Sequence, residues 1–146
     1  MEKIQSSVLI SKPAEDIFAF LSAPENHARF IPGMLEFAKT SPGSFAEAGA
    51  TARGVRRFLG IKMVIPYEVT EVEPDSRLGM KGSMGPISFE DGYVLDPLGA
   101  STRVKFWLQP TLTGLAKLAR PLVAQIGKTH AAETLDGLKK ALEGTG

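Results

Sequence analysis

The fold is decided by residues 111–143, which read TLTGLAKLARPLVAQIGKTHAAETLDGLKKALE. Apolar residues recur in this stretch at the spacing of an α-helix, and helix-favouring Ala, Leu and Lys are abundant in it. Gly144 follows as a typical helix C-cap. Because Pro121 must either start the main helix or kink it, we expect a break there, with the two halves packing against different surfaces. A helix of this length cannot bury its apolar stripe alone, which predicts a sheet beneath it.

The residues before this helix supply the sheet. Apolar and polar residues alternate over residues 4–10, which predicts an opening strand. Two short helices follow, one beginning at Pro13 and one over residues 25–30, before the Ile31-Pro32-Gly33 break. Turn residues then separate six further predicted strands, and Pro66 inside one of them indicates an edge strand or a bulge. These strands are expected at residues 34–40, 50–58, 61–69, 78–84, 87–95 and 102–108.

This order of elements predicts an α+β fold. An antiparallel sheet of about seven strands twists and curls, so it should wrap partly around the long C-terminal helix. The 146 residues fit one domain, residues 1–146, which is long enough to bury a core without metals or disulfides.

The composition excludes several classes of function. Lys and Arg total 17 against 16 Asp and Glu, and this balance argues against nucleic acid as the main partner. The absence of cysteine excludes disulfides, a thiolate nucleophile and Cys-based zinc sites. No signal-peptide pattern and no run of ~18 apolar residues is present, so we expect no stable membrane insertion and a cytoplasmic location.

Six segments together resemble a known family. They are PAEDIFAFL (13–21), PEN (24–26), FIPGM (30–34), YEVTEVEP (67–74), TRV (102–104) and LDGLKKALE (135–143). This combination resembles the START-like superfamily, also called SRPBCC, which includes polyketide cyclases/dehydrases and lipid-transport proteins. The resemblance implies the helix-grip fold with a ligand space between sheet and helix, and it implies no cofactor and no shared catalytic motif.

The inner face of the predicted sheet is rich in methionine and aromatic residues, which adapt to ligands of irregular shape. Such a set forms either a packed core or the wall of a cavity, and the resemblance favours a cavity. Small residues on the helix, Ala124, Gly127 and Ala131, limit how completely it fills the space beneath it. The predicted ligand-binding residues are Met34, Met63, Tyr67, Met80, Met84, Phe89, Asp91, Tyr93, Phe106, Leu118, Leu122 and Ile126.

Asp91 is the one charged residue on the predicted face that also carries Phe89 and Tyr93. A carboxylate in an apolar interior costs several kcal/mol unless it is paired, hydrated or protonated. Asp91 is therefore either a polar anchor for a ligand or a residue that a bulge near Gly92 turns to solvent. Both alternatives remain open on the sequence.

Other candidate sites are weaker. His130 and Glu133 lie three residues apart on the helix, but zinc needs three or four ligands, so a solvated pair and no metal site are expected. The arginines at 53, 56 and 57 are expected on a solvated outer face, although alternation points Arg56 away from the other two. Gly127-Lys128-Thr129 lacks the first glycine of a phosphate-binding loop. No catalytic residue is predicted.

The residues, together with the functions that the family resemblance implies, leave three candidate functions. The first is binding or transport of a small hydrophobic molecule such as a lipid, quinone, sterol-like or polyketide-like compound. The second is an aromatase/cyclase-type enzyme in which Tyr67, Asp91 or Tyr93 acts as acid or base. The third is an interaction module of the ribosome- or chaperone-associated type, which an exposed apolar patch around Trp107 would favour. The sequence leaves monomer and homodimer open.

Overall fold

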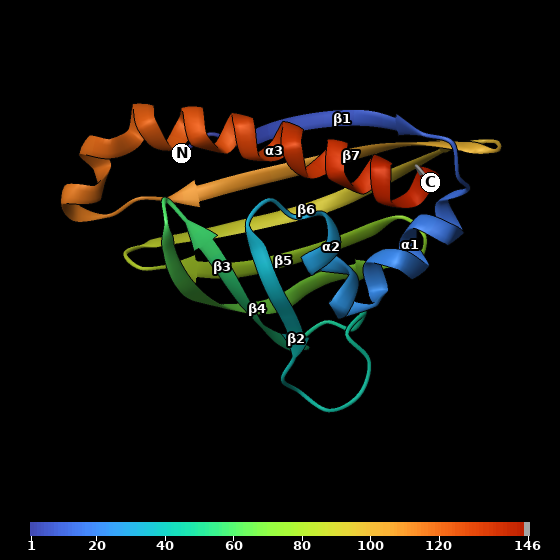
Figure 1. The fold of residues 1–146 in the computed structure, drawn as a ribbon, viewed down its shortest axis with the longest axis horizontal. Coiled ribbons are helices and arrows are strands. Elements are labelled where there is room, and N and C mark those ends of the chain that lie inside the picture. The colour runs from blue at the N-terminus through green and yellow to red at the C-terminus, as the bar shows by residue number, and fades with distance from the viewer. Residues whose placement is uncertain (145–146) are drawn as a thin grey trace.

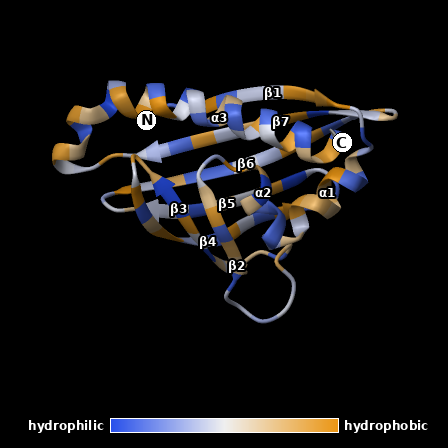
Figure 2. Ribbon diagram, in the orientation of Figure 1, coloured by the Kyte–Doolittle hydropathy of each residue, from blue (hydrophilic) through white to orange (hydrophobic). Residues whose placement is uncertain are grey.

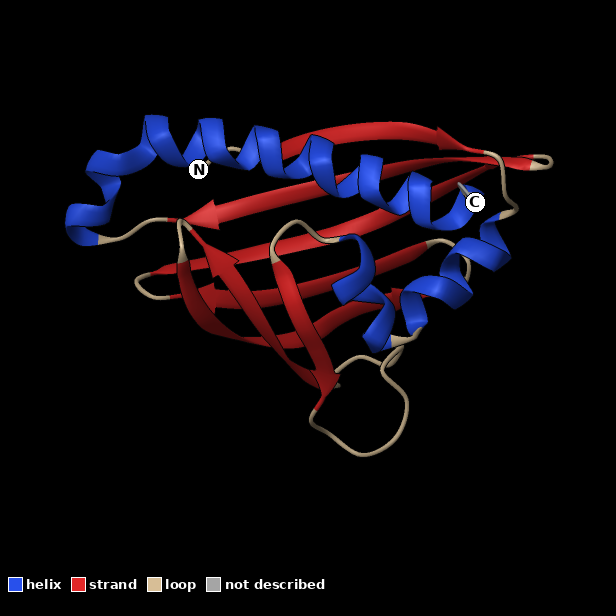
Figure 3. Cartoon of the chain, in the orientation of Figure 1, coloured by secondary structure: helices blue, strands red, loops and turns tan. Residues whose placement is uncertain are grey.

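The computed structural model describes residues 1–144, which form one curved antiparallel sheet and a long C-terminal helix (Figures 1 and 3). The seven strands are ordered β1-β7-β6-β5-β4-β3-β2, so the first two strands in the chain form the two edges. This arrangement confirms the predicted α+β helix-grip fold. The strands are β1 (Ile4–Ile10), β2 (Met34–Lys39), β3 (Thr51–Phe58), β4 (Ile61–Glu73), β5 (Arg77–Met84), β6 (Ile87–Leu98) and β7 (Ser101–Thr111).

The helices lie on one side of the sheet and follow the predicted order. The first predicted short helix is α1 (Ala14–Ser22), and the second is a 3₁₀ turn, η1 (Pro24–Asn26), continued by α2 (His27–Phe30). After β7 come a second 3₁₀ segment, η2 (Gly114–Ala119), and the long helix α3 (Arg120–Glu143). No helix in residues 1–144 is long and apolar enough to cross a membrane.

Pro66 lies in β4, which has β3 on one side and β5 on the other, so the prediction of an edge strand is wrong. The pairing of β4 with β5 begins at Tyr67 and Gly82, and Pro66 lies just outside it. On the other side Pro66 pairs with Arg53 of β3. A residue without a backbone N–H fits there because β4 needs hydrogen bonds to β3 alone at that point. The bulge in β4 is further along, between Val69 and Glu71.

The C-terminal helix begins later than the sequence predicts. Strand β7 continues through Pro110 and Thr111, and Pro121 lies in the first turn of α3, where its missing N–H costs no hydrogen bond. The leucines before and after Pro121 do not pack as expected: Leu118 is 81% exposed and Leu122 is 62% exposed. All buried residues of α3 lie from Gly127 onward. Figure 2 shows the apolar residues that this leaves along η2 and the first turns of α3.

The second half of α3 closes one end of the molecule. It packs against β1 and β7 at one sheet edge and against α2, which in turn packs on β2 at the other edge. Gly137 makes the contact with α2 possible, because a Cβ there would lie 2.5 Å from the Phe30 carbonyl oxygen. The imidazole of His27 is fully buried beneath this contact among aromatic rings. The rings around it are those of Phe30, Phe37, Phe45 and Tyr93.

Candidate functional site

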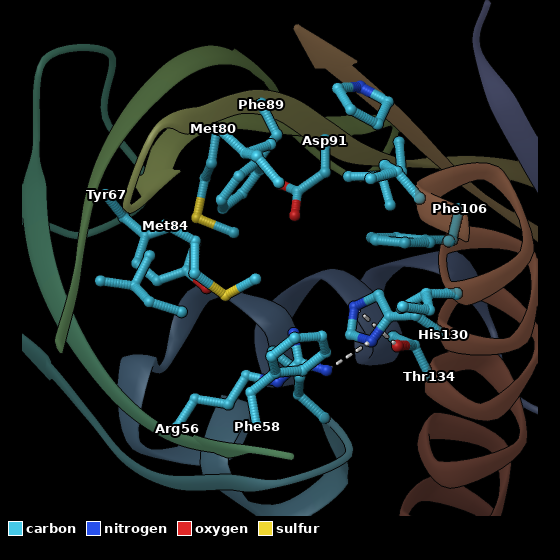
Figure 4. Close-up of a pocket in the computed structure, with 18 of the residues that line it drawn as sticks. Arg56, Phe58, Tyr67, Met80, Met84, Phe89, Asp91, Phe106, His130 and Thr134 are labelled. Carbon is cyan, nitrogen blue, oxygen red and sulfur yellow. Dashed lines mark hydrogen bonds between the residues drawn. The ribbon is translucent and has the colours of Figure 1, made fainter. Parts of the chain in front are cut away.

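A cavity of about 260 Å³ lies between the sheet and α3 (Figure 4). Its wall is almost entirely apolar, because the inward residues of β3 to β7 are methionine, aromatic or aliphatic at most positions. The lining residues are Ile31, Arg56, Phe58, Leu59, Ile65, Tyr67, Met80, Met84, Ile87, Phe89, Asp91, Tyr93, Phe106, Leu108, Pro110, Ala119, Leu122, Val123, Ile126, Gly127, His130 and Thr134.

The cavity reaches the surface at one end of the molecule. Leu59 and Leu122 both line it and are both mostly exposed, at 80% and 62%. Leu59 lies at the tip of the β3–β4 hairpin, where it and Gly60 both have positive φ, as the two central residues of a tight hairpin turn do. The mouth is therefore bounded by this hairpin and by the start of α3.

Nine of the predicted ligand-binding residues line the cavity, and three do not. The nine are Tyr67, Met80, Met84, Phe89, Asp91, Tyr93, Phe106, Leu122 and Ile126. Met34 is buried beneath Gly54 in the packed core, and half-buried Met63 pairs with Arg56 in the sheet. Leu118 points to solvent because η2 has no sheet beneath it.

The small residues of α3 do less than expected to create space. Gly127 borders the cavity, but a Cβ there would lie 2.5 Å from Ile4 Cδ1, so the Ile4 side chain already occupies its other side. Ala131 is fully buried in the core and, like Ala124, is not part of the cavity wall. The cavity therefore results mainly from the curvature of the sheet.

Asp91 points into the cavity. The pairing of β6 with β5 and β7 is continuous through Asp91 and Gly92, so the bulge that would have turned the carboxyl outward is absent from these strands. The residue is 8% exposed, and its Oδ1 atom is buried without a hydrogen-bond partner within residues 1–144. Burial raises the pKa of Asp91 from 3.8 to about 7, because an apolar surrounding disfavours the charged carboxylate.

Arg56 and His130 form a polar pair on the other side of the cavity. The Nη2 atom of Arg56 lies 3.2 Å from Nδ1 of His130, and Nε2 of His130 lies 3.4 Å from the Thr134 hydroxyl (Figure 4). Burial, together with the charge of Arg56, lowers the pKa of His130 to about 4. The imidazole is therefore neutral near pH 7.

The expectation that Arg56 and His130 face solvent is wrong. Along β3, Arg56 has the same inward orientation as the buried Ala52 and Gly54. On α3, His130 lies on a row of every fourth residue that also holds Leu122, Ile126 and Thr134. Glu133 of the predicted solvated pair is exposed, whereas His130 borders the cavity. Both inward positions follow from the sequence spacing, but the charge of the residues suggested the opposite.

The remaining polar groups act as neutral or structural groups. Burial raises the pKa of Tyr67 and of Tyr93 well above the ordinary value of 10, so neither phenol is ionised near neutral pH. His27 is outside the cavity, where Nε2 bonds the Leu21 carbonyl oxygen at 2.8 Å and burial lowers the pKa of the ring to about 4. Within residues 1–144 no group of three or more His, Asp or Glu side chains is placed to hold a metal ion.

Trp107 lies on the outer face of the sheet, as strand alternation predicts. The indole packs over Gly92, where a Cβ would lie 2.8 Å from Nε1, and the Lys3 ammonium nitrogen is 4.5 Å from the centre of the ring. Trp107 is half-buried by these contacts. It therefore gives no specific support to an interaction surface.

Residues 1–143 match the model of the family described as polyketide cyclase / dehydrase and lipid transport. The chain belongs to this family. No curated protein sequence matches it.

Solved structures with similar folds have low sequence identity to this chain. The di-domain ARO/CYC BexL from the BE-7585A biosynthetic pathway aligns with a TM-score of 0.82 and 16% identity, over 98% of this chain and 47% of that one. The chain thus spans about half the length of that protein. TTHA0849 from Thermus thermophilus aligns with a TM-score of 0.77 and 20% identity, over 99% and 100% of the two chains. A START superfamily protein from Mycobacterium smegmatis aligns with a TM-score of 0.70 and 22% identity, over 97% and 94%. At these identities the likeness concerns the fold.

Proposed function

We propose that this protein binds a small hydrophobic molecule in the cavity between the sheet and α3. The observation that carries the proposal is an apolar cavity of about 260 Å³ that reaches the surface and contains the buried carboxyl of Asp91, whose Oδ1 atom has no hydrogen-bond partner within residues 1–144. Ligand pockets in proteins commonly combine an apolar wall with a few polar groups that fix the orientation of the ligand. Membership of the polyketide cyclase/dehydrase and lipid-transport family supports the same conclusion.

In this proposal the affinity comes from apolar area and the orientation comes from Asp91. Apolar area removed from water contributes about 25 cal/mol per Å² before the costs of association. The carboxyl of Asp91, on the wall between Met80 and Leu108 of the neighbouring strands, accepts a hydrogen bond from a ligand hydroxyl or amine. Met80, Met84 and Phe89 supply flexible or aromatic contact surface beside it.

Two measurements test this function. Native mass spectrometry of the purified protein is expected to show a co-purified lipophilic compound, or binding of an added fluorescent fatty acid. The variant Met84→Trp is expected to fold and to weaken binding at least tenfold, because the larger ring fills space near the mouth. Leu35→Trp, at an exposed position in β2 that does not line the cavity, is the matched control. If neither added lipophiles nor co-purified compounds bind wild-type protein, the proposed function is wrong.

A cyclase-type reaction in the same cavity is the second candidate. One observation favours it: with a pKa of about 7, Asp91 can both accept and donate a proton near neutral pH. The fold shared with the aromatase/cyclase di-domain is compatible with this role. Turnover of a poly-β-ketone substrate by wild-type protein and its loss in Asp91→Asn would support the reaction, whereas tight binding without turnover would contradict it.

A further inference from the structure

The polar groups of the cavity are divided between two walls. Asp91 lies on β6, whereas Arg56 lies on β3, and two strands separate them in the sheet. Figure 4 shows Asp91 and the Arg56–His130 pair on opposite sides of the cavity, with Met80, Met84 and Phe106 around the space between them. A ligand that fills the cavity therefore meets a carboxyl group on one side and a guanidinium group on the other.

The hydrogen bonds of His130 to Arg56 and Thr134 indicate which ring nitrogen of His130 carries the proton. A guanidinium group can only donate, so Nδ1 of His130 accepts the hydrogen bond from Arg56. The proton of the neutral ring is then on Nε2, which donates to the hydroxyl of the fully buried Thr134. His130 thus holds one edge of the guanidinium in place but contributes no negative charge.

The positive charge of Arg56 has no counter-ion in the residues that the structure describes. Arg56 takes part in none of the ion pairs within residues 1–144, and its Nε atom is buried without a hydrogen-bond partner. The nearby acid Glu133 is on the exposed face of α3 and acts on Arg56 only through space. A partly desolvated cation with free donors is costly unless a ligand supplies the missing acceptor.

We propose that the natural ligand is a small amphipathic carboxylic acid whose carboxylate is bound by Arg56. This inference rests on the proposed function and specifies the ligand of the same cavity. The planar guanidinium matches a carboxylate, which can accept two parallel hydrogen bonds from it. The apolar body of the ligand then lies against Met80, Met84 and Phe89.

The composition of the wall favours a carboxylate over a phosphate. Arg56 is the sole Lys or Arg among the described residues that line the cavity. A phosphate dianion usually recruits several cationic or backbone donors, whereas a single arginine fork satisfies a monoanionic carboxylate. The phenyl ring of Phe58, whose centroid is 5.5 Å from the Arg56 guanidinium carbon, further limits the space around the fork.

The test compares two ligands that differ only in their polar group. Octanoate and 1-octanol are titrated into ¹⁵N-labelled protein at pH 6.5, and binding is followed by NMR. Octanoate is ionised at this pH, and Asp91 with its pKa of about 7 is mostly protonated and repels the carboxylate little. Wild-type protein is expected to bind octanoate at least tenfold more tightly than 1-octanol, with the largest shifts near Arg56 and His130.

Variants at two arginines of β3 test whether the guanidinium of Arg56 causes the preference for octanoate. Arg56→Met is expected to weaken octanoate binding at least tenfold and to leave 1-octanol binding within threefold. The substitution removes the guanidinium group and puts an uncharged, apolar side chain in its place. Arg53→Met is the matched control: Arg53 is exposed, pairs with Glu36 at 3.6 Å and does not line the cavity, so neither affinity should change.

The other possible results separate the carboxylate preference from the proposed function. Equal affinity for the two compounds, or an equal loss of both in Arg56→Met, overturns the carboxylate preference and leaves the proposed function standing. If neither compound binds wild-type protein, the carboxylate preference is wrong, and the proposed function is wrong as well if no co-purified or other added lipophile binds.

Discussion

At the scale of single residues, three buried titratable groups act in opposite directions on stability as pH changes. The folded-state pKa of Asp91, about 7, is above its ordinary value, so its contribution to stability is fully present below pH ~4 and is lost as pH rises through 7. The folded-state pKa values of His27 and His130, about 4, are below 6.5. Their contribution is present above pH 6.5 and is lost as pH falls through 4.

The opposite contributions of Asp91 and of the two histidines overlap between pH 4 and 6.5. A variant that removes the Asp91 carboxyl therefore separates them better than the pH dependence of wild-type stability does. Asp91→Asn removes the carboxyl titration and leaves both histidines. The free energy of unfolding of the variant relative to wild type is expected to increase from pH 4 to pH 7, by up to about 4 kcal/mol. Urea denaturation across this pH range measures it. A difference that does not change with pH would show that Asp91 is not buried as a carboxyl in solution.

Residue spacing predicts orientation in this protein more reliably than residue type does. Strand alternation puts Asp91 on one face with Phe89 and Tyr93, and a bulge near Gly92 is the open alternative; the pairing of β6 that the structure describes has no such bulge, and Asp91 faces inward. Arg56 and His130 are expected in solvent because of their residue type, although alternation separates Arg56 from Arg53 and Arg57, and His130 shares a helical row with Leu122 and Ile126. The free-energy cost of burying Arg56 and His130 cannot be predicted from the sequence, because it depends on the hydrogen bond between these two residues, which lie 74 residues apart in the chain.

At the scale of elements, two glycines in α3 let the helix approach other parts of the chain. Glycine weakens a helix by about 1 kcal/mol relative to alanine, so each position has a reason in packing. At Gly137 the obstacle to a side chain is the backbone carbonyl of Phe30, at 2.5 Å from a Cβ. At Gly127 the obstacle is Ile4 Cδ1, also at 2.5 Å, which is the flexible end of a side chain.

This difference predicts opposite outcomes for the same substitution. Gly137→Ala should destabilise the protein by about 1–3 kcal/mol, because backbone atoms of α2 or α3 must move to accommodate the methyl group. Gly127→Ala should lie within about 1 kcal/mol of wild type, because the gain in helix propensity offsets the cost of rotating Ile4. Thermal and chemical denaturation of both variants measure these values. Equal effects at the two positions would contradict the assignment of Gly137 as the contact that closes α3 onto α2.

The sequence predicts the strands and helices well, except where an apolar helix stripe has no sheet to pack against. Alternation located the first strand, and turn residues located the other six to within a few residues, since the turns need glycine or proline locally. The leucines at 115, 118 and 122 matched an apolar helix stripe, yet the structure leaves all three exposed. Periodicity predicts that a face is apolar, but the sheet ends before it reaches η2, and the sequence does not show where the sheet ends.

At the scale of the whole molecule, the two ends of the helix-grip differ in packing. At the closed end, α2, the second half of α3 and the aromatic rings around His27 form a continuous buried core. At the open end, η2, the start of α3 and the β3–β4 hairpin surround the mouth of the cavity and expose apolar side chains. Segments with few buried contacts open more readily, so local stability should decrease from the closed end to the mouth.

Hydrogen exchange measured over the whole chain tests this gradient. Amides of residues 120–127 in α3 should exchange at least tenfold faster than amides of residues 131–141, although both lie in one continuous helix. Saturating octanoate should slow exchange in residues 120–127 and in the β3–β4 hairpin more than at the closed end, because Leu59, Leu122 and Ile126 line the cavity that the proposed ligand would fill. Exchange at residues 131–141 serves as the internal control. Uniform exchange along α3, or uniform slowing by the ligand, would mean that α3 opens as a unit and that the mouth is no weaker than the core.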